Sequence, residues 1–299
     1  MAADDRNRRK RRPSPARRPG QGSRAGGRPH DRQRQAPLPE TQVGSDSPAP
    51  DNTSWDPVAT WYTGWVGKGG SIYHRRVAVP TVLRLAGAAR GERLIDIGCG
   101  HGILARPVLK TGAHYTGVDF SPKLIQAARN DNPRSARFHH GDARRLLELP
   151  DLSEGSQDIA VFMLSIQDMD PLTEILQQAT TLLRPGGRLV IFMLHPAFRV
   201  PRGSGWGVDE NRKLRYRRVD HYLNELAVPM KAFAEAGNAG RRGSTWSFHR
   251  PLSAYFDGIF QGGMVVDAFE EIADPLEKQP SGIPMFVAIR ASKPVAAGR

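Results

Sequence analysis

A glycine-rich turn follows a short β-type run in the first third of the chain. The sequence Asp96-Ile97-Gly98-Cys99-Gly100-His101-Gly102 leads directly into a helical pattern. Glycines let the main chain turn tightly and let a ligand approach it, while the free N–H groups at a helix start attract an anion. Asp119 ends the next β-type run, 21 residues after Gly98, where a carboxylate suits two ribose hydroxyls. We therefore expect a nucleotide-type ligand at this turn.

The spacing of the glycines differs from the dinucleotide-binding fingerprint. That fingerprint has the pattern Gly-x-Gly-x-x-Gly, and its third glycine would fall on Ile103. A nicotinamide cofactor is therefore not expected.

The turn is instead the first of five blocks that resemble the motifs of class I S-adenosylmethionine-dependent methyltransferases. The blocks follow one another in the order of that family: LIDIGCGHG (94–102), YTGVDFSPKLI (115–125), FHHGDARRL (138–146), SQDIAVFMLSIQDMD (156–170) and LRPGGRLVIFMLHP (183–196). The fourth block looks most like the small-molecule group that includes the ubiquinone/menaquinone C-methyltransferases. The resemblance implies S-adenosylmethionine as the cofactor. It also implies a Rossmann-like α/β fold with a seven-stranded sheet, six strands parallel and the last antiparallel, and helices on both faces.

The resemblance assigns cofactor contacts position by position. Asp96 is expected to meet the methionine ammonium, and Asp119 to accept hydrogen bonds from both ribose hydroxyls. Asp142 is expected to accept from the adenine amine, and the alternative that it caps the helix beginning at Ala143 stays open. Cys99 is expected to be a small filler of the loop. The remaining expected contacts are Gly98, Gly100 and Gly102 at the methionine and ribose, Phe120 on the adenine, Ala143 through its backbone, and Leu164 or Ser165 beside the sulfonium.

Methyl transfer from a sulfonium needs a positioned acceptor lone pair and, for a protonated acceptor, a base. The predicted fourth and fifth strands deliver Gln167, Asp168 and His195 at their ends. His195 is the first choice as catalytic base, because its ordinary pKa near 6.5 suits proton transfer at neutral pH, and Asp168 is the second. Two alternatives stay open: His195-Pro196 could be a structural turn, and Asp168 could cap the helix that begins near Pro171.

Two missing patterns narrow the chemistry. The segment after the predicted fourth strand reads Ser165-Ile166-Gln167-Asp168 in place of Asn/Asp-Pro-Pro-aromatic, which argues against methylation of exocyclic base amines and glutamine amides. Cys99 is the single cysteine and lies in the cofactor loop. This position excludes a cysteine-nucleophile methylation of pyrimidines, an intrachain disulfide and a cysteine-based metal site, and no metal is expected.

The elements that must position these residues alternate along the chain. Strands that are apolar on both faces and separated by helices indicate a parallel sheet wound by right-handed crossovers. The predicted strands are 93–98, 114–119, 136–142, 158–164, 188–194, 264–269 and 285–290, and the predicted helices are 103–110, 122–130, 143–149 and 172–183.

One methyltransferase domain is expected over residues 54–294, with a helical entrance segment at 54–90. Related methyltransferases fold such a segment over the cofactor, so Tyr62 is expected near the methionine end. His74 and Arg76 are expected at the cofactor carboxylate or the substrate. The alternative is that the aromatic residues of this segment only pack on the sheet.

The insertion at residues 197–250 is expected to cap the carboxyl ends of the strands, where open α/β sheets bind ligands. It interleaves arginine with aromatic residues, a composition that suits bases, phosphates or carboxylates. Gln167, Arg199 and Trp206 are the expected substrate contacts. A solvated basic face is the alternative interpretation.

The basic charge is concentrated at the N-terminus. The chain carries a net charge of +13, of which residues 1–35 supply +9. Residues 1–53 are rich in Arg, Pro and Gly and poor in large apolar residues, so they are predicted to be a disordered tail, and 295–299 form a short C-terminal tail. Nucleic acid could bind the N-terminal tail through sequence-independent contacts, and a purely solvated tail is the alternative.

The leading hypothesis is a cytoplasmic S-adenosylmethionine-dependent methyltransferase that acts on a small molecule. Two alternatives stay open: an RNA methyltransferase whose tail and cap hold tRNA or rRNA, and a non-catalytic cofactor-binding regulator. The sequence has no apolar run of the ~18 residues that a membrane-spanning helix needs. No feature of the sequence indicates an oligomeric state.

Overall fold

The structure, a computed structural model, describes residues 53–231, 244–277 and 281–295. The predicted N-terminal tail, apart from Thr53, lies outside the described residues. So do the middle of the predicted cap and all but Val295 of the predicted C-terminal tail. No helix in the described part of the chain is long and apolar enough to cross a membrane.

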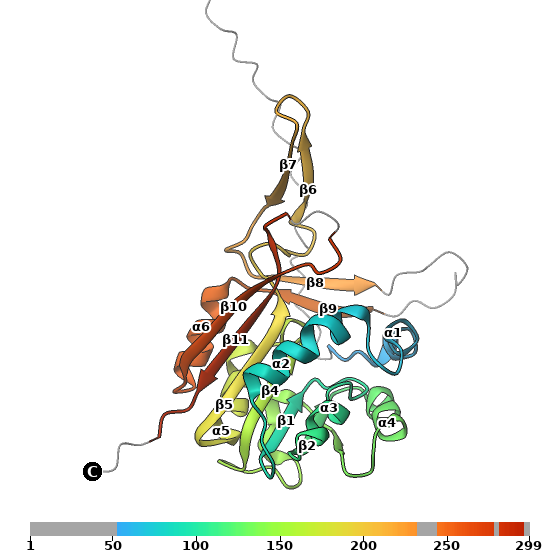
Figure 1. Cartoon of the computed structure of the whole chain (residues 1–299), viewed down its shortest axis with the longest axis vertical. Helices are drawn as coiled ribbons and strands as arrows, with labels where there is room; N and C mark the ends of the chain where they lie inside the picture. Colours follow the sequence, from blue (N-terminus) through green and yellow to red (C-terminus); the bar gives the residue numbers. More distant parts are fainter. Residues whose placement is uncertain (1–52, 232–243, 278–280, 296–299) are drawn as a thin grey trace, which may run out of the picture. The chain divides into compact units, whose positions relative to one another are not determined.

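A seven-stranded sheet forms the centre of the domain, in the strand order β10-β11-β5-β4-β1-β2-β3 (Figure 1). Strand β11 runs antiparallel to both of its neighbours, so the other six strands point the same way. The predicted fold, six strands parallel and the last antiparallel, is confirmed. The strands are β1 (Arg93–Ile97), β2 (His114–Asp119), β3 (Arg137–His140), β4 (Gln157–Met163), β5 (Leu183–Leu194), β10 (Val265–Ala273) and β11 (Pro284–Ser292).

Helices cover both faces of the sheet (Figure 1). One face packs against α2 (Val79–Ala86), α3 (Ala105–Lys110) and α4 (Pro122–Asp131). The other packs against α5 (Leu172–Leu182), α6 (Leu252–Gln261) and the 3₁₀ segment η3 (Ala143–Glu148). The central strands are therefore apolar on both sides, as the sequence pattern indicates.

Helix α6 is the helix that the sequence did not predict. Gly258 lies within it and lowers its helix propensity. A Cβ at this position would fall 2.5 Å from the side chain of Leu176, so the glycine lets α6 approach α5 closely. The predicted helix 143–149 is also different: η3 is a 3₁₀ segment interrupted by non-helical backbone at Arg145.

The entrance segment contains three short helical pieces before α2, namely η1 (Asp56–Val58), α1 (Ala59–Val66) and the π-helical η2 (His74–Ala78). The segment after β5, which showed no clear period in the sequence, forms two antiparallel hairpins. These pair β6 (Ser204–Asp209) with β7 (Leu214–Val219), and β8 (Leu226–Lys231) with β9 (Ser244–His249).

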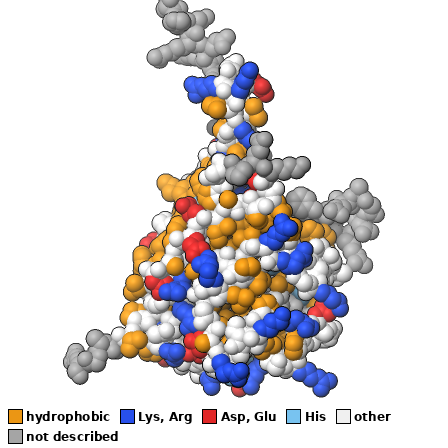
Figure 2. Space-filling view, in the orientation of Figure 1, with side chains coloured by type: hydrophobic (Ala, Val, Ile, Leu, Met, Phe, Trp, Pro, Cys, Tyr) orange, Lys and Arg blue, Asp and Glu red, His pale blue; other side chains and the backbone are white. Residues whose placement is uncertain are grey.

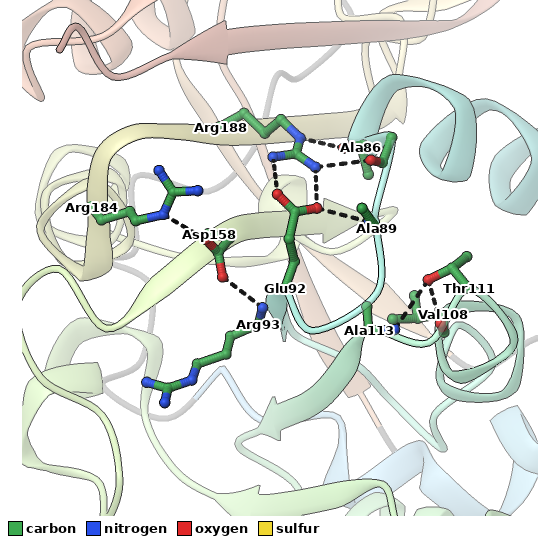
Figure 3. Close-up of polar contacts among 11 residues, drawn as sticks. Ala86, Ala89, Glu92, Arg93, Val108, Thr111, Ala113, Asp158, Arg184 and Arg188 are labelled. Carbon is green, nitrogen blue, oxygen red and sulfur yellow. Dashed lines mark hydrogen bonds and ion pairs between the residues drawn. The ribbon is translucent and has the colours of Figure 1, made fainter.

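A polar cluster fastens the amino ends of the central strands (Figure 3). The guanidinium of Arg188 on β5 donates to both carboxylate oxygens of Glu92, at 2.9 and 2.7 Å. It also donates to the carbonyls of Ala86 and Gly87, which end α2. Hydrogen bonds from Arg188 hold the pKa of Glu92 below its usual range. The Arg188 side chain thus connects β5 with Glu92, which directly precedes β1, and with the C-terminal end of α2.

We expect Arg188→Ala to lower the free energy of unfolding by about 2 to 3 kcal/mol. The substitution leaves the half-buried Glu92 carboxylate and two helix-end carbonyls without their donor. Urea unfolding followed by circular dichroism measures the change. Arg184→Ala is the matched control, because Arg184 is 47% exposed in its pair with Asp158 and should cost less than about 1 kcal/mol. Equal losses in the two variants would contradict the assignment.

Candidate functional site

A cavity of about 630 Å³ lies at the carboxyl ends of the parallel strands. Its walls come from the turn after β1 and from the ends of β2, β4 and β5, with residues 53–65 and the β8–β9 hairpin adding further wall. The volume is within the range of small-molecule and cofactor pockets. Most of the residues that the sequence singled out meet here.

The glycine turn is held to the end of β2 by main-chain and carboxylate hydrogen bonds. The carbonyl of Val118 accepts from the amides of Gly98 and Cys99, at 2.8 and 3.0 Å. The carboxylate of Asp119 accepts from the amides of Gly100 and Ser121, at 2.8 and 2.9 Å. Each carboxylate oxygen of Asp119 uses one of these bonds and keeps a lone pair for another donor. Burial raises the pKa of Asp119 in spite of these two amides.

Two glycines of the turn are required for different reasons. Gly98 has φ +74°, and a Cβ there would lie 2.5 Å from the side chain of Ser165, so only glycine leaves the cavity wall open at this point. Gly102 does not line the cavity, which corrects its expected cofactor contact. A Cβ at Gly102 would lie 2.8 Å from Phe138, so this glycine allows the turn to pack on β3.

Asp96 is buried beneath the turn with one of its oxygens unpartnered. Oδ2 accepts a 2.7 Å hydrogen bond from Tyr115, while Oδ1 is buried and has no partner within the described structure. Burial raises the pKa of Asp96 to about 7; the Tyr115 hydrogen bond opposes the rise and the charge of Asp119 adds to it. A cationic group in the cavity would satisfy Oδ1 and favour the ionised form.

Asp142 caps η3, as the alternative interpretation held. Its Oδ1 accepts from the amide of Arg144 at 2.9 Å, and the guanidinium of Arg144 pairs with the same carboxylate. Burial raises the pKa of Asp142, but the Arg144 hydrogen bonds outweigh this effect and hold it below its usual range. Asp142 and Ala143 both line the cavity near Phe120, whose ring stacks against His140, so an adenine contact stays a prediction.

The entrance segment covers the turn and places two predicted residues on the cavity wall. Tyr62 packs edge-on against Trp55 and His101, with ring centroids 5.2 and 5.7 Å apart. His74 is buried, and burial lowers its pKa to about 4, with His101 and Arg75 adding to the effect, so it is neutral at pH 7. Arg76 is exposed and does not line the cavity, which corrects its expected contact.

The end of β4 supplies the titratable group best placed for proton transfer. Leu164 follows β4 with φ +59°, a left-handed conformation that is rare outside glycine and concentrates at functional sites. Ser165, Gln167 and Asp168 follow it on the cavity wall. Burial raises the pKa of Asp168 to about 8, while hydrogen bonding with Ser247 opposes this rise. Asp168 begins no helix, because Pro171 is the N-cap residue of α5.

His195 does not line the cavity, and both nitrogens of its ring already have hydrogen-bond partners. Its Nδ1 accepts from the amide of Ala197 at 3.2 Å, so Nε2 carries the proton that faces Glu271 Oε1 at 2.8 Å. The side chain is 1% exposed and packs on Phe198. Neither ring nitrogen has a lone pair free for an acceptor proton, so the first-choice base is corrected to a structural turn.

Arg199 and Trp206 line a second, much smaller pocket of about 40 Å³ that shares Met285 with the main cavity. Trp206 lies under the guanidinium of Arg215, 3.8 Å from the ring centroid. These two expected substrate contacts are therefore not part of the main cavity wall.

The β8–β9 hairpin, which supplied no predicted site residue, contributes Met230 and Ser247 to the main cavity wall. The alternation in Ser-Thr-Trp-Ser-Phe-His (244–249) was the available signal for it.

Comparison with known proteins matches residues 95–191 to the methyltransferase domain family. Demethylmenaquinone methyltransferase of Tropheryma whipplei is 35% identical over 112 residues, covering 36% of this chain and 44% of that protein. Ubiquinone biosynthesis O-methyltransferase of Xanthomonas euvesicatoria is 29% identical over 165 residues, covering 54% of this chain and 66% of that protein. The chain thus spans about half to two thirds of the length of these relatives.

Solved structures share the fold at low sequence identity. An S-adenosylmethionine-dependent methyltransferase from Mesorhizobium loti aligns with a TM-score of 0.58 and 24% identity, covering 71% of this chain and 96% of that one. The CcbJ methyltransferase from Streptomyces caelestis aligns with a TM-score of 0.59 and 19% identity, covering 83% of this chain and all of that one.

The raised pKa of Asp168 predicts that the protein loses stability as the pH rises. The folded chain holds this proton until about pH 8, whereas the unfolded chain releases it near the ordinary Asp value of 3.8. Between these values the folded state binds more protons, so the free energy of unfolding should fall with pH by roughly 1 kcal/mol per pH unit from this group. Urea unfolding at pH 5.5, 6.5, 7.5 and 8.5 should show the slope, and Asp168→Asn should reduce it. An unchanged slope in that variant would contradict the assignment.

Proposed function

We propose that the chain is a class I S-adenosylmethionine-dependent methyltransferase that transfers a methyl group from this cofactor to a small-molecule acceptor. One observation carries the proposal. A single cavity brings together the glycine turn, the carboxylates of Asp96 and Asp119, and a third carboxyl group, Asp168, at the end of β4. The matched relatives of the ubiquinone and menaquinone pathways support a small acceptor.

The chain's own residues fit the cofactor at three points. The unpartnered Oδ1 of Asp96 suits the methionine ammonium. The remaining lone pairs of Asp119 suit the two ribose hydroxyls. The turn at Gly98 and Gly100 gives the close main-chain approach that a bound nucleoside needs, since both have positive φ and line the cavity. When bound, the cofactor supplies an activated methyl group on a sulfonium.

The rest of the cavity favours an uncharged acceptor with apolar surface. Away from the residues proposed to hold the cofactor, the wall includes the aromatic and thioether side chains of Tyr73, Phe286, Met230 and Met285. Arg144 is the single Lys or Arg among the described residues of the wall, and it pairs with Asp142. The described part of the wall therefore offers a polyanion little complementary charge.

Asp168 is the residue that we assign to proton removal. With the cofactor bound as methyl donor, a carboxylate oxygen of Asp168 would take the proton that the acceptor loses on methylation. Only the ionised carboxylate can accept this proton, and with a pKa of about 8 it forms mainly as the pH approaches 8. Once ionised, it is a stronger base than an ordinary aspartate, which suits transfer from a hydroxyl or amine. Leu164 and Ser165 hold the neighbouring wall, with Ser165 Oγ donating to the carbonyl of Ile97 at 2.7 Å.

Asp119→Asn should weaken binding of S-adenosylhomocysteine by about 10- to 100-fold. The substitution removes the charge that strengthens the hydrogen bonds from ribose hydroxyls and disturbs the amides of the glycine turn. Isothermal titration calorimetry measures the dissociation constant. Asp151→Asn, which alters an exposed carboxylate paired with Arg137, is the control and should leave it unchanged. Unaltered affinity in Asp119→Asn would refute this cofactor pose.

Asp168→Asn should lower turnover by about 10²- to 10⁴-fold with cofactor affinity nearly intact, since it removes the base. His195→Gln should keep turnover within about threefold and instead reduce stability, because its contacts to Glu271 and Ala197 are structural. Transfer of labelled methyl groups into the small-molecule fraction of a cell extract measures turnover. The opposite pattern would return the base to His195.

The same assay run with total RNA tests the other hypotheses. Label in RNA would point to an RNA methyltransferase, and cofactor binding with no label in either fraction would point to a regulator. On the face shown in Figure 2, Lys and Arg side chains are spread in several groups and do not form one continuous basic surface. We expect label in the small-molecule fraction, because the described wall of the cavity is mostly apolar and Arg144 is its single Lys or Arg.

A further inference from the structure

The β8–β9 hairpin reaches the proposed acceptor end of the cavity from outside the matched segment 95–191. Ser247 on β9 lines the cavity together with Met230 on β8. Its hydroxyl donates to the main-chain carbonyl of Gln167 at 3.4 Å. Two residues before Ser247 on the same strand, Thr245 donates to the carbonyl of Thr53 at 3.3 Å, which ties the hairpin to the entrance segment. These contacts place Ser247 of the hairpin next to the segment that carries Asp168.

The Ser247 hydroxyl has two acceptors within reach and one proton to give. The first is the Gln167 carbonyl, and 3.4 Å is long for a hydroxyl donor, so this bond is weak. The second is the carboxyl group of Asp168, the next residue along the chain, which lines the same cavity and whose pKa is lowered by hydrogen bonding with Ser247. A hydroxyl rotates freely about its C–O bond, so its partner can change without movement of the main chain.

The other groups around Asp168 do little to stabilise its ionised carboxylate. Tyr62 from α1 and Tyr255 from α6 are buried near it, and burial raises the pKa of both, that of Tyr255 to about 12, so both stay neutral. Arg250, which follows β9, pairs with Asp170. Asp96 also adds negative charge to the same cavity wall. Among the groups around Asp168, Ser247 is the one whose hydrogen bonding lowers the Asp168 pKa and so favours the ionised form.

We propose that Ser247 is a positioning residue of the acceptor site, whose hydroxyl turns from the Gln167 carbonyl to the Asp168 carboxylate when that carboxyl group ionises. The inference rests on the role assigned to Asp168 in the proposed function. In the ionised state Ser247 holds one carboxylate oxygen and leaves the other for the acceptor's proton. After the proton has passed to Asp168, the hydroxyl returns to Gln167. The hairpin thereby sets both the orientation and the basicity of the base.

The titration of Asp168 tests this inference without a known acceptor. In protein labelled with ¹³C at aspartate carboxyl groups and saturated with S-adenosylhomocysteine, the Asp168 signal is assigned by its loss in Asp168→Asn. Ser247→Ala should raise its titration midpoint by about one pH unit, because the ionised form loses a donor. Ser247→Thr keeps the hydroxyl and should restore the wild-type midpoint. The acidic limb of the turnover profile, where activity rises as Asp168 ionises, should move with the same two variants.

Thr245→Val is the matched control, since it removes a hydroxyl two residues away on β9 that does not line the cavity. It should leave the Asp168 midpoint unchanged. A midpoint that does not move in Ser247→Ala, or that moves equally in Thr245→Val, overturns the inference. Full turnover in Asp168→Asn would instead overturn the role of Asp168 in the proposed function, while the titration would still report whether Ser247 donates to it.

Discussion

The attachment of the glycine turn to the end of β2 is the constraint on which the site depends. The turn leaves β1 and would otherwise have no fixed course, because three of its residues are glycines. The Val118 carbonyl and the Asp119 carboxylate hold its amides, and this is geometrically possible because β1 and β2 are adjacent and parallel. Parallel strands end at the same edge, so the ends of β4 and β5 meet the turn there as well.

This attachment places acidic groups close together at one edge of the sheet. Asp96, Asp119 and Asp168 all have raised pKa values because burial outweighs the hydrogen bonds that they receive. Such a site opposes folding until a partner supplies positive charge or hydrogen-bond donors. The Arg188–Glu92 cluster lies at the other end of the same strands, where both charges are paired and helix α2 is tied down (Figure 3). The amino ends of the strands thus carry the paired charges that stabilise the fold, and the carboxyl ends carry the cavity.

The sequence predicts the sheet well, and it also predicts that Gly98, Gly100 and Asp119 meet at one cavity, because both are local properties. Gly98, Gly100 and Asp119 lie within a few residues of strand ends, and a parallel sheet brings those ends together whatever the details of packing. The Asp142 cap was likewise anticipated as an alternative, since a short polar residue before a helix start is a local signal.

The acceptor side could not be predicted in the same way because it depends on distant partners. The His195 ring hydrogen-bonds to Glu271, which lies 76 residues further along the chain on β10, and no local sequence pattern predicts that contact. Ser247 faces Asp168 only because β9 packs beside the end of β4, which depends on how a hairpin folds back across the sheet. Gly102 was misassigned because a glycine needed for packing against Phe138 has the same appearance in sequence as one that faces a ligand.

The two halves of the cavity have separate origins along the chain. The turn, Asp119 and Asp168 lie inside the segment shared with other methyltransferases, whereas Met230 and Ser247 come from a hairpin that follows it. A hairpin can change length and side chains without disturbing the strand order that holds the turn. If the proposed function holds, exchange of this hairpin would change part of the acceptor wall and leave the residues proposed for the methyl donor in place, which makes the hairpin a natural segment to vary when new acceptors are sought.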